Sequence, residues 1–207
     1  MKIDKLKIKY LEPSTFKEMF ETEEYSNKLI TKQEKDLSFN CILDSCQFEN
    51  IDFNLIDIGE CQFVDVIFKN CDLSNLKFTN TNFTRVIFDN CRLIGINFNS
   101  CSLKNIYINN CNLKYSYFYN CQLNKIESNE SNYSESNFIY TQIKDVNFNK
   151  LTFENSEFSH CKLSDTDFSS CDITNLRIDF YSMKDIIVDQ IQAVSLSRYL
   201  QIKIKDF

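Results

Sequence analysis

The sequence of 207 residues has little of what most enzymes use at their sites. It contains two glycines, Gly59 and Gly95, one proline, one histidine and no tryptophan. Two isolated glycines cannot build the glycine-rich loops that cradle phosphates, which excludes nucleotide-binding folds of those types. The single His160 cannot build a histidine metal site and would have to serve any histidine-dependent nucleophile alone. We therefore expect a protein that is not an enzyme and that carries no metal or cofactor.

Basic residues are also in deficit, with 23 Lys and Arg against 29 Asp and Glu, a net charge of -6. Nucleic acids and anionic membranes select basic surfaces, so neither is the expected direct partner. Residues 1–10 place a charge at nearly every second position, and they lack the apolar stretch of a signal peptide or a membrane span. The composition predicts a cytoplasmic protein whose partner is a basic or DNA-binding protein.

What the sequence has is a repeat of five residues. Positions 43 to 178 at steps of five number 28, and 27 of them carry a large apolar side chain; Ser128 is the exception. These positions hold 14 of the 19 phenylalanines, and all ten cysteines lie two residues before such a position. No residue is inserted or deleted over this range, so the sequence is that of a repeat protein.

A period of five matches neither an alternating strand nor an amphipathic helix. Two inward residues two positions apart suit a short extended step followed by a turn, and Asn, Asp and Ser favour turns. Four such steps close a square coil of 20 residues, so residues 20 apart should stack. The column that begins at Cys46 continues with β-branched residues, as stacked short strands prefer. We predict an all-β square coil of about seven turns.

Units such as Cys71–Asn75 and Cys171–Asn175 resemble the A(D/N)LXX consensus of the pentapeptide-repeat family, with cysteine often in the first place. The resemblance implies a right-handed quadrilateral β-helix. We expect three regions: an N-terminal cap at 1–40, the β-helix at 41–188, and a C-terminal helix and short strand at 189–207 that dimerise.

The C-terminal segment narrows the resemblance to the quinolone-resistance (Qnr-like) subgroup. It is similar to the tail pattern D-x-x-Q-A-x-x-L-x-x-x-L-G-I, with Gln201 in place of the glycine, and it matches at Asp189, Gln192, Ala193, Leu196, Leu200 and Ile202. Asp189 suits an N-cap, and Ile202 and Ile204 alternate with lysines as on a short strand. The resemblance implies a head-to-head homodimer, with an interface of Ala193, Leu196, Leu200 and Ile202.

Residues 1–40 lack the repeat, and Thr15 and Glu18 have the spacing of a capping box at the start of a helix. We interpret this region as a cap over the first coil, because solenoids need polar caps. The alternative is an arm that binds a partner.

Two sets of outward residues are candidate partner-binding sites. Qnr-like proteins are thought to imitate duplex DNA and to engage DNA gyrase or topoisomerase IV, and the members without inserted loops tend to be described as gyrase inhibitors. That role would rest on an acidic set: Glu49, Asp52, Asp72, Asp89, Glu127, Glu130 and Glu135. The alternative is a rigid scaffold for another protein, bound through the N-terminal cap or through an aromatic set: Tyr117, Tyr119, Ile139 and Tyr140.

The remaining features are predicted to be structural. The phase of the repeat explains the cysteine spacing, and no CxxC occurs, so we expect buried thiols rather than disulfides or metal ligands. The same phase turns His160 outward and Cys161 inward, which argues against a catalytic pair. Ser128 predicts a local bulge or an underpacked corner.

Overall fold

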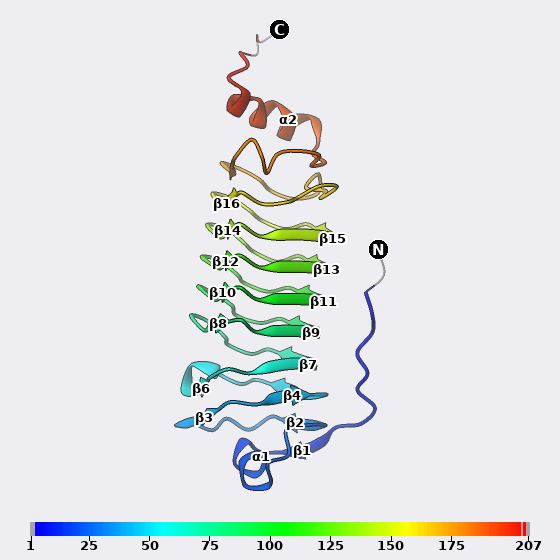
Figure 1. The fold of residues 1–207 in the computed structure, drawn as a ribbon, viewed down its shortest axis with the longest axis vertical. Coiled ribbons are helices and arrows are strands. Elements are labelled where there is room, and N and C mark those ends of the chain that lie inside the picture. The colour runs from blue at the N-terminus through cyan, green and yellow to red at the C-terminus, as the bar shows by residue number, and fades with distance from the viewer. Residues whose placement is uncertain (1–2, 204, 206–207) are drawn as a thin grey trace.

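Short strands stack coil upon coil into a rod, shown in Figure 1 with a helix near each end. The computed structural model describes residues 3–203 and 205. The first strands are β1 (Glu12–Ser14), β2 (Lys28–Ile30), β3 (Leu37–Phe39), β4 (Ile42–Asp44), β5 (Gln47–Glu49), β6 (Ile56–Ile58), β7 (Gln62–Lys69) and β8 (Lys77–Thr79). They are followed by β9 (Asn82–Asp89), β10 (Asn97–Asn99), β11 (Ser102–Asn109), β12 (Tyr117–Tyr119), β13 (Gln122–Asn129), β14 (Asn137–Ile139), β15 (Gln142–Asn149), β16 (Glu157–Ser159) and β17 (Arg177–Ile178).

All the strands pair in parallel, and the step is 20 residues except in β1–β2, β2–β5 and β3–β6, where it is 16, 18 and 19. Phe98 lies opposite Phe118, and Phe118 lies opposite Phe138. One sheet has the order β1-β2-β5-β7-β9-β11-β13-β15 with β4 on β7, a second runs β17-β16-β14-β12-β10-β8, and β3 pairs with β6. The predicted β-helix is thus confirmed. It has about eight turns rather than seven, since β2 already pairs with β5 before the recognisable repeat begins.

The core is the fivefold repeat turned inward. From 43 to 178, every repeat position is buried except Ile58, which is half-buried. The rings of Phe118 and Phe138 stack with centroids 4.6 Å apart, and those of Phe138 and Phe158 with centroids 4.5 Å apart. Each buried phenylalanine contributes about 1.5–3 kcal/mol relative to exposure, so this column is a main source of stability.

Asparagine explains how the coil turns with so little glycine. Asn50, Asn70, Asn90 and Asn110 lie at the same corner of successive coils, and all have positive φ. Asn tolerates this conformation better than most residues. Their side chains also bond along the rod, with Asn90 Nδ2 donating to Asn70 Oδ1 at 2.6 Å and Asn110 Nδ2 donating to Asn90 Oδ1 at 3.0 Å. The corners therefore form ladders of amides between coils.

The N-terminal end of the core is covered by α1 (Phe16–Thr22). The predicted capping box is confirmed, because Thr15 Oγ1 accepts from Glu18 N and the Glu18 carboxylate accepts from Thr15 N. Phe16 is buried, and its ring stacks on Phe48 with centroids 5.7 Å apart. A 3-10 turn, η1 (Phe53–Leu55), lies in the adjoining coil.

Residues 3–11 do not cover the end of the rod. Followed from residue 11 back to residue 3, they run extended along the side of the rod and away from α1, as Figure 1 shows. Lys7 N donates to Asp65 Oδ1 at 2.9 Å, and Asp4 N donates to Asn105 Oδ1 at 3.2 Å. We call residues 3–11 the arm.

The C-terminal end carries α2 (Gln190–Leu196) and a 3-10 turn, η2 (Ser197–Leu200). Within the described part of the chain after η2, residues 201–203 and 205 form no strand. Ile204, the second apolar residue of the expected strand, lies outside the described residues. Gln201 ends η2 with φ of 56°, the left-handed conformation that glycine adopts without strain.

Candidate functional site

The acidic candidates are spread over several coils, and the structure does not gather them into one patch. Four form ion pairs with basic side chains 20 or 21 residues away: Glu49 with Lys69, Asp72 with Arg92, Glu130 with Lys150 and Glu135 with Lys114. Positive and negative charges therefore alternate from coil to coil at these positions.

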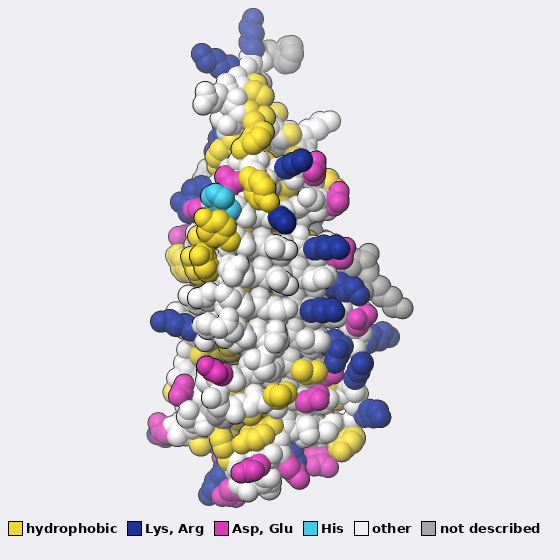
Figure 2. Space-filling view, viewed as in Figure 1, with side chains coloured by type: hydrophobic (Ala, Val, Ile, Leu, Met, Phe, Trp, Pro, Cys, Tyr) yellow, Lys and Arg dark blue, Asp and Glu magenta, His cyan; other side chains and the backbone are white. Residues whose placement is uncertain are grey.

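Other contacts of the acidic set are hydrogen bonds. Asp52 Oδ1 and Asp72 Oδ1 each accept the backbone N–H two residues on, at 2.9 Å, so these carboxylates shape turns. Asp89 accepts from Asn109 Nδ2 at 2.9 Å, and Glu127 accepts from Asn129 Nδ2 at 3.4 Å. Figure 2 shows Lys and Arg side chains along the edge of the rod beside β9–β15, with few acidic ones over the middle of that face.

The aromatic candidates lie together. The rings of Tyr117 and Tyr119 are parallel with centroids 6.3 Å apart, Tyr119 meets Tyr140 edge-on at 5.9 Å, and Ile139 lies opposite Tyr119 in the ladder. Sequence reasoning missed the next member, His160, whose ring is 4.9 Å from that of Tyr140. The step of 20 between Tyr140 and His160 could have found it. In Figure 2 the histidine adjoins a group of hydrophobic side chains.

We call Tyr117, Tyr119, Tyr140 and His160 the aromatic strip. Two of its members, Tyr140 and His160, have left-handed backbone conformations with φ of 52° and 54°. Asn80 and Asn120 occupy the same column of corners, where Asn adopts this conformation at low cost. A bulky residue at such a corner costs about 1–2 kcal/mol. An exposed ring kept at that cost is a candidate for contact with another molecule.

The C-terminal segment divides the expected dimer residues into two groups. Leu196 is only 8 % exposed and faces the last coil, whereas Ala193, Leu200 and Ile202 are exposed. Exposed apolar residues that the sequence reasoning left out lie nearby: Ile191 at 79 %, Val194 at 55 % and Phe180 at 77 % exposure. The i, i+3 spacing of Ile191 and Val194 was the signal that could have found two of them.

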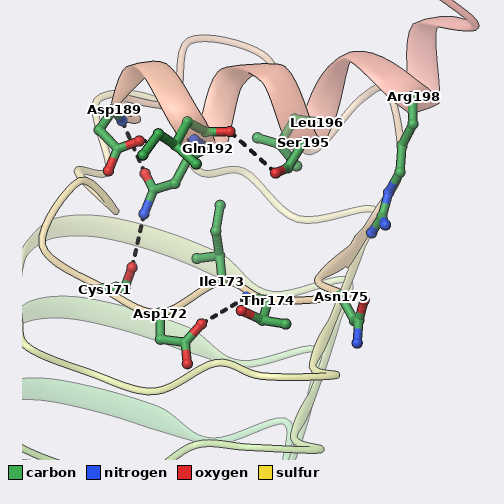
Figure 3. Close-up of a pocket in the computed structure, with 11 residues that line it drawn as sticks. Cys171, Asp172, Ile173, Thr174, Asn175, Asp189, Gln192, Ser195, Leu196 and Arg198 are labelled. Carbon is green, nitrogen blue, oxygen red and sulfur yellow. Dashed lines mark hydrogen bonds between the residues drawn. The ribbon is translucent and has the colours of Figure 1, made fainter. Parts of the chain in front are cut away.

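The tail motif has a structural role that Figure 3 displays. Asp189 Oδ1 accepts from Gln192 N, and Gln192 Oε1 accepts from Asp189 N, which forms a second capping box. The Gln192 amide then donates to the carbonyls of Phe168 and Cys171 at 3.0 and 2.8 Å. One side chain thus caps α2 and bonds it to the last coil, beside a pocket of about 350 Å³.

The cysteines are free thiols. Cys161 Sγ donates to the carbonyl of Phe138 at 3.1 Å, and burial raises the pKa of Cys161 to about 11, which makes it a poor nucleophile. His160 is exposed, with Nδ1 3.7 Å from Asp179, whereas Cys161 is buried, so the side chains of His160 and Cys161 do not face each other. In the part of the chain that the structure describes, no group of three His, Cys, Asp or Glu could hold a metal ion.

The expected bulge at Ser128 does not occur. Ser128 keeps the regular register between Ile108 and Phe148 within β13, and it is fully buried. Its Oγ lies 3.0 Å from the hydroxyl of Tyr133, the one tyrosine among the repeat positions. The small serine therefore makes room for the tyrosine hydroxyl and gives it a partner.

Family models agree with this architecture. A model described as "Pentapeptide repeat region" matches residues 40–118, and "Pentapeptide repeats (8 copies)" matches residues 136–175. The fold is a parallel β-solenoid with a C-terminal helix. The chain belongs to the pentapeptide-repeat family.

Among solved structures, full-length QnrB1, a plasmid-mediated fluoroquinolone resistance protein, is 21% identical with a TM-score of 0.48, covering 87% of this chain and 93% of that one. HetL, a pentapeptide repeat protein involved in heterocyst differentiation regulation in Nostoc sp. strain PCC 7120, is 9% identical with a TM-score of 0.29, covering 82% and 92%. Identities this low indicate the fold alone. No curated protein matches the sequence. None of the described helices is long and apolar enough to cross a membrane.

Proposed function

We propose that this chain is a cytoplasmic, non-enzymatic homodimer whose acidic rod binds DNA gyrase or topoisomerase IV in place of duplex DNA and so modulates fluoroquinolone susceptibility. The observation that carries the proposal is the C-terminal segment. Its Qnr-like residues Asp189 and Gln192 form the capping box and the bonds to the last coil, so the residues that carry the resemblance are also those that attach the helix to the solenoid.

The charges available for such mimicry are those not paired with a cation. Asp89 and Glu127 lie in the large sheet, on β9 and β13, and among the described residues neither lies within ion-pair distance of a basic side chain. Net negative charge over the whole chain, -6, would steer the rod to the basic DNA-binding surface of a topoisomerase. We therefore expect the interaction to weaken as salt rises.

The test is a gyrase supercoiling assay with purified protein, titrated with and without a fluoroquinolone. We expect inhibition of supercoiling, or rescue from the drug, at low micromolar protein. Reversing two charges, Asp89→Lys with Glu127→Lys, should weaken the effect about tenfold or more, since two attractive contacts become repulsive.

The matched control reverses Glu21 and Glu154, which changes the net charge equally but lies away from β9 and β13. It should leave the effect nearly unchanged. No effect of the unmodified protein at tens of micromolar, on gyrase or on topoisomerase IV, would contradict the proposal.

A second candidate is a rigid scaffold for a different protein, favoured by the exposed aromatic strip Tyr117, Tyr119, Tyr140 and His160. Tyrosines are enriched at the centres of protein interfaces. If the topoisomerase assays are negative, proteins retained by the unmodified chain should be compared with those retained by a Tyr119→Ser, Tyr140→Ser variant. Loss of a salt-insensitive partner, with an unchanged melting temperature, would support this candidate.

A further inference from the structure

The arm, residues 3–11, is held along the rod by its backbone. Its two bonds to the side of the rod come from the N–H groups of Asp4 and Lys7, and the acceptors are the side chains of Asn105 and Asp65. Side-chain oxygens on the rod that accept from backbone N–H groups hold a chain in an extended conformation, which is the chemistry of a peptide-binding surface.

The spacing of these bonds follows from the geometry of the two elements. An extended chain rises about 3.3 Å per residue, so Asp4 and Lys7 are about 10 Å apart along it. Asp65 and Asn105 are two coils apart, and two coils of stacked strands also span about 10 Å. Every third residue of an extended chain therefore meets every second coil of the rod.

The two rod side chains that accept the arm's N–H groups are buried. Asp65 is 3 % exposed and pairs with Arg85 through two bonds, Nε to Oδ1 at 2.6 Å and Nη2 to Oδ2 at 2.7 Å. Burial alone raises the pKa of the Asp65 carboxyl, but the Arg85 guanidinium and the Lys7 N–H outweigh it and lower that pKa. Asn105 is equally buried, and Lys125 reaches Asp4 at 3.8 Å. We call Asp65, Arg85, Asn105 and Lys125 the arm-binding strip.

The arm itself shows which side chains suit the strip. Its apolar residues Ile3, Leu6, Ile8 and Leu11 are half-buried, and its lysines Lys5, Lys7 and Lys9 are exposed. Apolar side chains thus pack on the rod while lysines stay in water. An occupant of the strip needs free backbone amides and this apolar–lysine pattern.

The same surface continues beyond the strip. The next acceptor two coils past Asn105 is Asp145, which is exposed and lines a pocket of about 460 Å³ with Lys144, Val146, Lys162 and Asp165. The column Asp65, Asn105, Asp145 therefore places a side-chain oxygen on every second coil.

We propose that this side of the rod is a peptide-binding surface that the arm occupies within its own chain, and that it binds an extended apolar–lysine segment of a partner protein when the arm is displaced. This partner site is separate from the topoisomerase proposal and does not depend on it. The arm acts as a competitor held at high effective concentration.

The experiment uses full-length protein and an acetylated peptide of residues 3–11 with a C-terminal fluorescein, followed by fluorescence anisotropy. Asp4→Pro with Lys7→Pro removes both N–H donors and should release the arm. We expect this variant to bind the peptide at least tenfold more tightly than the unmodified protein, and trypsin to cut the released arm at least tenfold faster. A peptide with proline at the same two positions should not bind.

The matched control is Lys5→Pro with Lys9→Pro, at positions whose N–H groups make no bond to the strip in the described structure. It should exclude the peptide as the unmodified protein does. A second release variant, Leu6→Ser with Ile8→Ser, tests the same point without prolines. The proposal is overturned if neither release variant binds the peptide, if the unmodified protein binds it equally well, or if the proline peptide binds as tightly.

A longer peptide tests the register. Three alanines added before Ile3 place one more backbone N–H at the level of Asp145, so binding to the release variant should tighten about threefold to tenfold, the worth of one hydrogen bond. An added Asp145→Leu change should abolish this gain and leave the shorter peptide unaffected. An equal gain with Asp145→Leu would overturn the predicted continuation.

Discussion

At the scale of single residues, Ser128 and Tyr133 form a polar pair inside an apolar core. Both are buried, five residues apart, and their hydroxyls are 3.0 Å apart. Burial raises the pKa of the Tyr133 hydroxyl, although its bond to Ser128 opposes the change. Either hydroxyl alone would be a buried polar group without its partner, which costs more than the bond itself contributes.

This pair predicts strong coupling between two substitutions. Ser128→Ala or Tyr133→Phe alone should lower the free energy of unfolding by about 1–3 kcal/mol, because each leaves one hydroxyl unpaired. The double variant should lose no more than either single one, since it removes both hydroxyls. Denaturant unfolding of the four proteins measures this, and strictly additive losses would show that the two hydroxyls do not interact.

At the scale of elements, α2 is attached to the solenoid by few contacts. Gln192 and Leu196 face the last coil, and the hydroxyl of Tyr199 donates to the carbonyl of Leu176. The helix has only seven residues, too short to be stable alone in water. Its order therefore depends on docking.

We predict that Gln192→Leu loosens the C-terminal helix while the solenoid stays folded. The change leaves the carbonyls of Phe168 and Cys171 without their side-chain donor and breaks the capping box, a local loss of about 2–4 kcal/mol. Hydrogen exchange of residues 190–200 should speed up at least tenfold. Gln190→Leu, at an exposed position of the same helix, is the control and should change exchange little.

At the scale of the whole molecule, the two ends of the rod differ. The N-terminal end is closed by α1, with Phe16 and Met19 buried on the core. The C-terminal end, at the top of Figure 1, exposes Phe180, Ile191 and Val194, and an apolar recess of about 580 Å³ lies by Phe180 and Leu200. Exposed apolar surface of this kind is a candidate interaction site, and a two-fold axis would let it pair with a second copy of the chain.

We therefore predict a head-to-head dimer that depends on this end. Ile191→Asp with Val194→Asp should shift the protein from dimer to monomer at tens of micromolar, because the charges would be desolvated in the interface. Analytical ultracentrifugation measures the change. Ile42→Asp, an exposed residue near the opposite end, should remain dimeric. A dimer that survives the double change would place the interface elsewhere.

Much of the fold was predictable because a pentapeptide repeat restricts each residue to one environment. The burial of Phe118 and Phe138, and the free buried thiol of Cys161, follow from their places in the count of five. The capping box at Thr15 was predictable for a similar reason, since it involves residues three apart. Local periodicity needs no knowledge of distant contacts.

The candidate sites were less predictable, because they depend on which residues meet across coils and at the ends. The aromatic side chains were found, but His160 was not joined to them, and Leu196, expected at the dimer interface, docks on the last coil. Ion pairs such as Glu130 with Lys150 neutralise part of the acidic set, and they join residues 20 positions apart.

The sequence alone determined the coil, its period and the inward residues, because each follows from neighbours within five positions. Only the tertiary structure decided the course of the arm, whose bonds join residues 58 and 101 positions apart. It also decided which face of α2 is free, since that face is set by where Gln192 finds carbonyls on the last coil. Contacts between distant segments depend on three-dimensional spacing, which no local pattern encodes.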